Sequence, residues 1–196
     1  FWYSQSCSNT KNLEMNLKSI LSYSFQSFYL AGSFLLLFIF LPTFYNLSIG
    51  IPLSVIGLVI LTSRLFDVIS DFLIGYLSEK RIISGRSKKN QILLGIIVFI
   101  FSLFGLYVIQ SDNIYSFIFF YNLALVSYSI AIIPYDSIVI DQKKILKKRF
   151  RLAAIKEIFA ILGVLSALII PTVISKLQGV DLLNPNVIKI SGLIFI

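Results

Sequence analysis

Three charged residues, Arg64, Asp67 and Asp71, lie inside an otherwise apolar stretch and are the residues best placed to do chemistry. Their i, i+3 and i+7 spacing puts all three on one face of a helix, with the carboxylates one turn apart. An ionised Asp near the middle of a membrane span costs roughly 2.5–3.5 kcal/mol, so two of them indicate a partner or a purpose. We expect this face to look into protein or water. The alternative is a structural charge cluster in which Arg64 neutralises one Asp.

Two carboxylates one turn apart suit a small positive ion. A hard cation such as Na⁺ prefers several oxygen ligands, and hydroxyl groups from a neighbouring helix can complete the set. A proton suits the same pair, because two carboxylates in a low-dielectric site do not both ionise easily. The residues leave both ions open. A zinc or haem site built from His and Cys is excluded, because the chain has no His and Cys7 is its one Cys.

The composition is that of an integral membrane protein. Hydrophobic residues make up 57% of the chain, charged residues 13%, and the mean hydropathy is +0.89. The net charge of +8 comes from short basic runs between apolar spans, a pattern that indicates membrane orientation and no nucleic-acid partner. An intramembrane aspartyl protease would carry a Gly-x-Gly-Asp tetrapeptide, which this sequence lacks. We therefore do not expect an enzyme.

The apolar spans that position these charges predict an all-α membrane protein. They run over about 20–42, 52–77, 91–110, 114–140 and 152–174, and a sixth begins near Val187 and stops at Ile196. Residues 1–14 form a polar tail that we expect to lie upstream of the native start at Met15. Residues 15–196 then form the transmembrane domain.

The loops predict the orientation of these spans. The loops at 79–89 and 142–151 are strongly basic, whereas those at 43–51, 110–113 and 175–186 together hold one Lys and two Asp. The positive-inside rule places the basic loops and the amino terminus in the cytoplasm. We expect a multi-pass protein of the cell (inner or plasma) membrane, with the lipid bilayer as one of its partners.

Two blocks of residues carry a resemblance to a known family. The first comprises Tyr45, Gly57, Arg64-x-x-Asp67-x-x-x-Asp71, Gly75-Tyr76-Leu77-Ser78-Glu79 and Gly85-Arg86-x-Lys88. The second comprises Tyr128-Ser129, Ile133-Pro134-Tyr135, Asp141 and Arg149-x-Arg151-Leu152-x-Ala154-x-Lys156. Together they resemble the glycoside-pentoside-hexuronide:cation symporters of the major facilitator superfamily, the group that includes the melibiose permease.

The resemblance, over about residues 23–175, implies a carrier of twelve helices in two six-helix halves. This chain would be an incomplete N-terminal half, a major facilitator-type bundle with five full transmembrane helices and the start of a sixth. Its partners would be the missing C-terminal half of the same carrier, a small-molecule solute and a monovalent cation. A half alone should not complete a transport cycle, since alternating access requires one bundle to rock against the other.

The resemblance also implies roles for the charged residues. Asp67 and Asp71 would bind the coupling cation, Na⁺ or H⁺, with Ser70 and Ser129 as neutral oxygen donors. No other cofactor or metal is expected. Our hypothesis for Arg64 is a coupling switch, which pairs with the empty carboxylates and is displaced when a cation arrives.

Four further residues are candidates for the solute pathway. Tyr128 and Tyr135 can hydrogen-bond or stack on a sugar-like solute, although a tyrosine in a membrane helix is more often a packing residue. Asp136 and Lys156 are expected to pair across two helices. The alternatives are that Asp136 is hydrated or pairs with a loop lysine, and that Lys156 reaches the lipid headgroups.

The sequence departs from the sugar carriers of this family at two positions. Ala31 and Ile132 stand where those carriers have acidic residues, so two strong charge-assisted anchors for a sugar are lost and a disaccharide is a doubtful solute. We expect cation-coupled symport of a small organic solute, sugar or glycoside-like, by alternating access. The alternatives are a carrier of a lipid-like amphipathic solute, which the 18 Phe residues would suit, and a non-functional fragment.

The loop after the second span resembles the signature loop of the superfamily, which latches the cytoplasmic ends of neighbouring helices. Its motif residues are Gly75, Glu79, Gly85, Arg86 and Lys88. Gly75 is expected to permit close approach of a neighbouring helix.

Overall fold

The computed structural model describes residues 17–83, 88–109, 113–140 and 146–195, and the polar tail at 1–14 lies outside them. Over the described residues there is no strand, and the elements are α1 (Leu17–Leu35), η1 (Leu36–Phe40), α2 (Leu41–Ile49), α3 (Leu53–Ile83), α4 (Lys88–Phe104), η2 (Gly105–Ile109), α5 (Ile114–Ile140), α6 (Leu146–Gln178) and α7 (Pro185–Ile194). The two η segments are π-helical turns that continue the α-helices before them. The predicted all-α fold is confirmed.

Five helical stretches of the described chain are long and apolar enough to cross a membrane. They are Ile20–Ile49, Leu53–Ser78, Lys88–Ile109, Ile114–Ile138 and Phe150–Gln178. The shorter helix α7 follows, with Pro185 in its first turn and the Asn184 side chain accepting a hydrogen bond from the Asn186 backbone N–H at its start. This agrees with five full spans and the beginning of a sixth.

Two of the predicted loops are shorter than expected. The segment 43–51 was expected to connect two spans. In the structure Pro42 lies in the first turn of α2, where a missing N–H is tolerated, and the helix ends at Gly50, whose φ of 78° is left-handed. The segment 175–186 is likewise helical through Gln178 and again from Pro185, so the prediction of full-length loops at both places was wrong.

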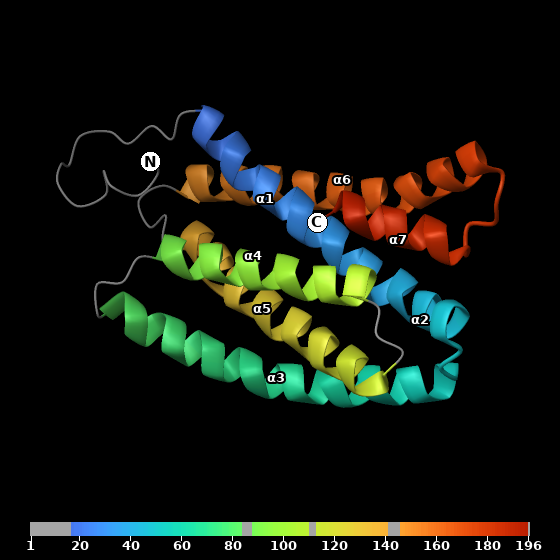
Figure 1. Ribbon diagram of the computed structural model, residues 1–196. Helices are drawn as coiled ribbons and strands as arrows, with labels where there is room; N and C mark the ends of the chain where they lie inside the picture. The colour runs from blue at the N-terminus through green and yellow to red at the C-terminus, as the bar shows by residue number, and fades with distance from the viewer. Residues whose placement is uncertain (1–16, 84–87, 110–112, 141–145, 196) are drawn as a thin grey trace.

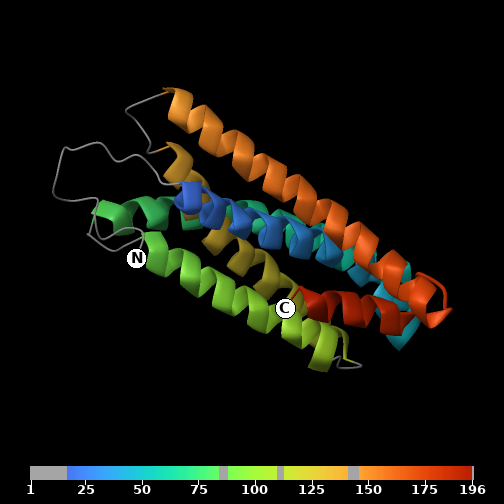
Figure 2. The same cartoon turned by 90° about the horizontal axis from the view of Figure 1, so that it is seen from above.

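The helices differ in how much of their surface is covered. Helix α1 lies along α6, α4 lies along α5, and α3 packs on the other side of α5 (Figures 1 and 2). In the most apolar stretch of the first span 50% of the residues are buried, whereas in the corresponding stretches of α3 and α6 only 17% are buried. Buried aromatic residues fill the centre, and among them the Tyr45 hydroxyl donates to the Leu106 carbonyl in η2 at 3.1 Å. Helices α3 and α6 are therefore the outer helices of the bundle.

Close helix contacts occur at glycines other than Gly75. A Cβ at Gly95 would lie 2.6 Å from the backbone nitrogen of Ala131, so α4 and α5 touch backbone to backbone there. A Cβ at Gly163 of α6 would likewise clash with the Phe28 carbonyl of α1. A Cβ at Gly75 or at Gly57 would meet nothing within 4 Å. The expectation of a close approach at Gly75 was wrong, because α3 is an outer helix and its Gly75 face carries no neighbour among the described residues.

The ends of α4 and α5 that adjoin the two basic loops are joined by a buried lysine. Lys88 Nζ donates a hydrogen bond to the Ser137 hydroxyl at 2.8 Å, and Lys88 is only 6% exposed. The side chain of Glu79 and the residues Gly85 and Arg86 lie outside the described part of the chain. Of the loop motif, Lys88 is therefore the residue for which a latching contact is seen.

Candidate functional site

The Arg64–Asp67 pair lies in the middle of α3. Arg64 Nη1 donates a hydrogen bond to Asp67 Oδ2 at 3.1 Å, and the side chains are 31% and 13% exposed respectively. Asp71 lies one turn further along α3, is exposed, and repels the Asp67 carboxylate electrostatically. One continuous helix thus brings the three charged residues onto one face, as the spacing predicted.

The second carboxylate oxygen of Asp67, Oδ1, is the atom of this cluster that can still accept a hydrogen bond. Asp67 Oδ1 is buried and accepts no hydrogen bond of ordinary geometry from the described residues. The Ser129 hydroxyl on α5 interacts with the same carboxylate across the α3–α5 contact. Ser70 donates its hydroxyl hydrogen to the Asp67 backbone carbonyl at 2.9 Å, which leaves the lone pairs of its Oγ available. No third acidic side chain joins Asp67 and Asp71 within the described residues.

Arg64 has a second set of partners that sequence reasoning missed. Its guanidinium carbon lies 5.2 Å from the ring centroid of Phe34 and 4.6 Å from that of Phe38, on the first span. Phe34 in turn stacks on Tyr128 of α5, with the ring centroids 4.5 Å apart. The sequence offered one signal for this contact: Phe34 and Phe38 have i, i+4 spacing and therefore lie on one face of the span that precedes α3.

A second ion pair joins α5 to α6. Lys156 Nζ lies 2.6 Å from Asp136 Oδ1, and their side chains are 13% and 49% exposed. The Glu157 carboxylate is further away, at 3.7 Å, and 65% exposed. The predicted pairing of Asp136 with Lys156 is confirmed.

Tyr135 lies next to the Lys156–Asp136 pair and is hydrogen-bonded to α1. The Tyr135 hydroxyl donates to the Tyr23 carbonyl at 2.8 Å, and the Tyr23 hydroxyl donates to the Tyr135 carbonyl at 2.7 Å. Their rings stack with centroids 4.4 Å apart, and Lys156 Nζ lies 5.4 Å from the Tyr135 ring centroid. Tyr135 is fully buried, so in this conformation it serves packing between helices. Tyr23 was not among the predicted site residues, because its contact depends on the register between two distant helices.

Tyr128 lies between the two ion pairs. Its ring stacks on Phe34, which faces Arg64, and it precedes Asp136 by about two turns of α5. Tyr128 and Tyr135 are seven residues apart and share one face of α5, while Ser129 and Asp136 share the neighbouring face. Asp67 of α3 meets Ser129 and Lys156 of α6 meets Asp136, so these five predicted candidates, called the polar track below, are spaced along α5.

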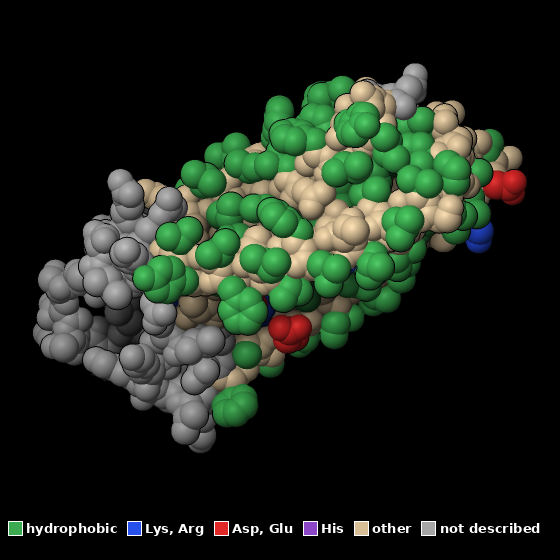
Figure 3. Space-filling view, turned by 90° about the horizontal axis from the view of Figure 1, so that it is seen from below, with side chains coloured by type: hydrophobic (Ala, Val, Ile, Leu, Met, Phe, Trp, Pro, Cys, Tyr) green, Lys and Arg blue, Asp and Glu red, His purple; other side chains and the backbone are tan. Residues whose placement is uncertain are grey.

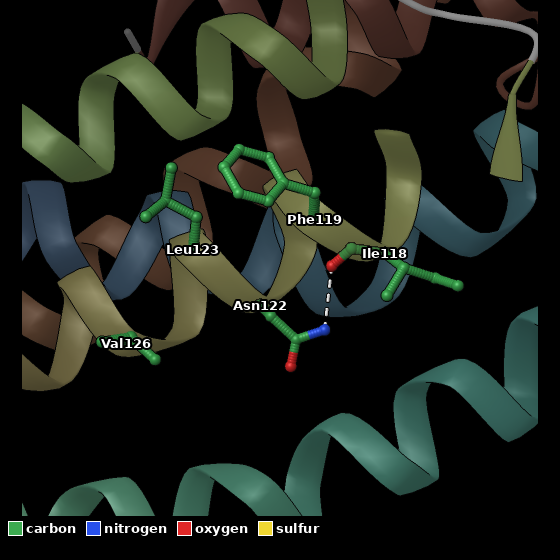
Figure 4. A pocket seen from close by; sticks show the side chains of 5 residues that line it. All are labelled: Ile118, Phe119, Asn122, Leu123 and Val126. Carbon is green, nitrogen blue, oxygen red and sulfur yellow. Dashed lines mark hydrogen bonds between the residues drawn. The ribbon is translucent and has the colours of Figure 1, made fainter. Parts of the chain in front are cut away.

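A hollow of about 280 Å³ lies beside the N-terminal half of α5, before the track residues of that helix. It is lined by Ile118, Phe119, Asn122, Leu123 and Val126 (Figure 4). Its one polar side chain, Asn122, points toward α3 and donates from Nδ2 to the Ile118 carbonyl at 2.8 Å within its own helix. The hollow is open and apolar, so it offers a polar solute no anchor.

The fold and the site together define a class of protein: a polytopic helical membrane protein with partly buried ion pairs in its helices, one within α3 and one between α5 and α6. The family model described as MFS/sugar transport protein matches residues 22–196, and the chain belongs to that family of the major facilitator superfamily. No curated protein matches the chain, and no solved structure does. The membership makes the protein a transporter, which is not an enzyme, and a multi-pass membrane protein.

Proposed function

We propose that the helices of this chain belong to a secondary active carrier that moves a small organic solute together with a cation, by alternating access. The observation that supports it most directly is the mid-span carboxylate of Asp67, which is mostly buried, is paired with Arg64 on Oδ2, and accepts no hydrogen bond of ordinary geometry on Oδ1 from the described residues. An acid in the middle of a membrane span is a functional-site hypothesis by default. The resemblance to the melibiose permease branch supports the same assignment for Asp67 and Asp71.

The coupling ion would bind at Asp67. A proton would neutralise the carboxylate, and Na⁺ would gather oxygens from Asp67, Asp71, Ser70 and Ser129, which is the hard-ligand set that a small cation prefers. Either event weakens the attraction between Asp67 and Arg64, so ion occupancy changes the position of Arg64. Arg64 thereby acts as the coupling switch of the proposal.

The solute would contact the polar track at Tyr128, Asp136 and Lys156. Lys156 is mostly buried, and among the described residues Asp136 is its one acidic partner at hydrogen-bonding distance. A solute hydroxyl or acid that takes over one of these partners would exchange a charge-assisted hydrogen bond for another of similar strength. The proposed contacts are polar, which favours a sugar-like solute over a lipid-like one.

The hydrophobic surface of the molecule indicates what the carrier contacts in the membrane. Seen from the side on which α3 lies in Figure 1, the surface is largely hydrophobic, with few charged side chains (Figure 3). The lipid bilayer and a second helical half are the proposed partners for this face, and the exposed Asp71 would point toward the second half. The amino terminus and the basic loops are proposed to lie in the cytoplasm, according to the positive-inside rule.

The test is solute uptake by the complete product of the gene, purified and reconstituted into lipid vesicles. Labelled sugars and glycosides, and separately a lysolipid, are offered with a Na⁺ gradient, a proton gradient or no gradient. We expect gradient-driven accumulation of a sugar-like solute, and its loss in the Asp67→Asn/Asp71→Asn double variant but not in Asp181→Asn, an exposed acid outside the spans. Accumulation that the double variant retains would contradict the cation site, and uptake of the lysolipid alone would contradict the solute class.

A further inference from the structure

We propose that Phe34 and Phe38 form an aromatic cradle that holds the Arg64 guanidinium when the coupling cation takes its place at Asp67. The two Phe residues would thus be positioning residues that set the apparent affinity for the cation. The inference rests on the proposed function, because it concerns the same cation site. It concerns two residues of the first span that touch neither the cation nor the solute.

Both rings face the same guanidinium group. Their centroids lie 6.2 Å apart with the planes only 7° from parallel, and the Arg64 guanidinium carbon is within 5.2 Å of one centroid and 4.6 Å of the other. A guanidinium within about 6 Å of a ring centroid is attracted by the negative face of the ring. Arg64 is therefore held from two directions: by Asp67 on its own helix, and by the cradle on the first span.

The cradle is built at an irregular turn of the first span. The π-helical segment Leu36–Phe40 begins between the two Phe residues, and the Leu41 backbone N–H donates to the Leu36 carbonyl across it. Such a turn changes the direction of the side chains that follow it, and π-turns are frequent at functional sites. Phe34 stacks on the ring of Tyr128. Tyr128 also packs on Phe99 of α4, with the ring centroids 5.8 Å apart. The position of the cradle is thus fixed by α4 and α5.

The cradle favours the state in which the cation is bound. In the state described here, part of the Arg64 charge is compensated by the Asp67 carboxylate at 3.1 Å. When a cation or proton neutralises Asp67, Arg64 carries a full charge at mid-span, and the attraction of the two ring faces increases. Without the rings, displaced Arg64 would have to remain uncompensated in an apolar environment, which makes cation binding less favourable.

The test is the cation concentration that gives half-maximal transport in the reconstituted complete gene product. In the variant Phe34→Leu/Phe38→Leu this concentration should rise by up to about fivefold, because the rings contact Arg64 in both states and only the increase in their attraction on cation binding counts. The rate at saturating cation should change little. Phe34→Tyr/Phe38→Tyr should restore the wild-type value, because a tyrosine ring offers the same negative face.

A matched control removes two rings that do not face a cation. Phe101 and Phe104 of α4 are exposed, and Phe101→Leu/Phe104→Leu should leave the half-maximal concentration unchanged. Phe38 is 43% exposed, so Phe38→Leu alone should fold even if the double variant does not, and it should raise the value about threefold.

The outcomes separate the cradle from the cation site. If Asp67→Asn abolishes cation dependence while the Phe34→Leu/Phe38→Leu and Phe38→Leu variants keep the wild-type half-maximal concentration, the cradle is wrong and the cation site stands. If Asp67→Asn keeps full cation dependence, both proposals are wrong. If leucine and tyrosine variants shift the value equally, ring electrostatics are not the cause and the cradle is again wrong.

Discussion

Two ion pairs of the described helices, Arg64–Asp67 on α3 and Lys156–Asp136 between α5 and α6, are built in opposite ways. In the first pair the acid is the more buried partner, with 13% of the Asp67 side chain exposed against 31% for Arg64. In the second the base is buried, with 13% of the Lys156 side chain exposed against 49% for Asp136. In the first pair Asp67 Oδ1 accepts no hydrogen bond of ordinary geometry from the described part of the chain, whereas in the second pair Lys156 Nζ and Asp136 Oδ1 are only 2.6 Å apart.

The difference separates a pair that can exchange partners from a pair that ties helices together. Arg64 and Asp67 share one helix, so separating the two side chains moves no helix against another. Lys156 and Asp136 belong to different helices, so separating them loosens α5 from α6. An incoming positive charge is attracted to the buried acid of the first pair, and an incoming acceptor to the buried base of the second.

The largest effect should come from neutralising the buried acid. Asp67→Asn removes both the cation ligand and the partner of Arg64, and we expect the apparent affinity for the coupling cation to fall roughly hundredfold or more. Asp71→Asn should have a smaller effect, because Asp71 is exposed and makes no ion pair with a described residue. The measurement is gradient-driven uptake by the complete gene product as a function of Na⁺ concentration and of pH. Equal losses in the two variants would show that burial does not distinguish the two acids.

The next largest effect should be a loss of stability when one partner of the Lys156–Asp136 pair is replaced by a residue of the opposite charge. Lys156→Asp and Asp136→Lys each place two like charges together, and we expect each to lower the free energy of unfolding by about 1–2 kcal/mol. The combined variant Asp136→Lys/Lys156→Asp should recover at least half of that loss. Thermal unfolding of the purified protein in detergent measures it. Additive losses in the combined variant would mean that the pair is not what joins α5 to α6.

The parts of the site that sequence predicted are those fixed within one helix or by a charge that needs a partner. The i, i+3, i+7 spacing alone places Arg64, Asp67 and Asp71 on one face, because helix geometry is the same in every fold. Lys156 requires a counter-charge in an apolar environment, and Asp136 was the acid on the neighbouring span.

The parts that escaped prediction depend on how helices sit against one another. The contact of Phe34 and Phe38 with Arg64 depends on how the first span sits against α3, and the π-turn that begins between the two Phe residues is not contained in a simple 3.6-residue period. The Tyr23–Tyr135 contact joins residues 112 positions apart. Gly75 was expected at a close helix crossing, yet the crossing lies at Gly95, because which face of a helix is covered cannot be read from a glycine alone.

A smaller effect is expected from the tyrosines beneath the second pair. Tyr23→Phe and Tyr135→Phe each remove one hydroxyl hydrogen bond while keeping the stacked rings, so each should lower the free energy of unfolding by about 1 kcal/mol. The two bonds run in opposite directions between the same two residues, and the double variant therefore tests whether they act as one unit. Detergent unfolding curves of the two single variants and the double variant give the answer. If neither single variant changes the free energy of unfolding, the hydrogen bonds between α1 and α5 do not stabilise the region of the second pair.

The smallest effect should come from the outer acid beside Lys156. Glu157 lies 3.7 Å from Lys156 Nζ and is 65% exposed, so solvent screens most of its attraction. We expect Glu157→Gln to change the free energy of unfolding by less than about 0.5 kcal/mol, and Asp136→Asn to lower it more, since Asp136 is the partner at 2.6 Å. The two variants carry the same chemical change on neighbouring helices, so each controls for the other. If they were equally destabilised, the charge of Lys156 would be shared between two acids, and the second region would be a three-membered network that a solute could enter without separating α5 from α6.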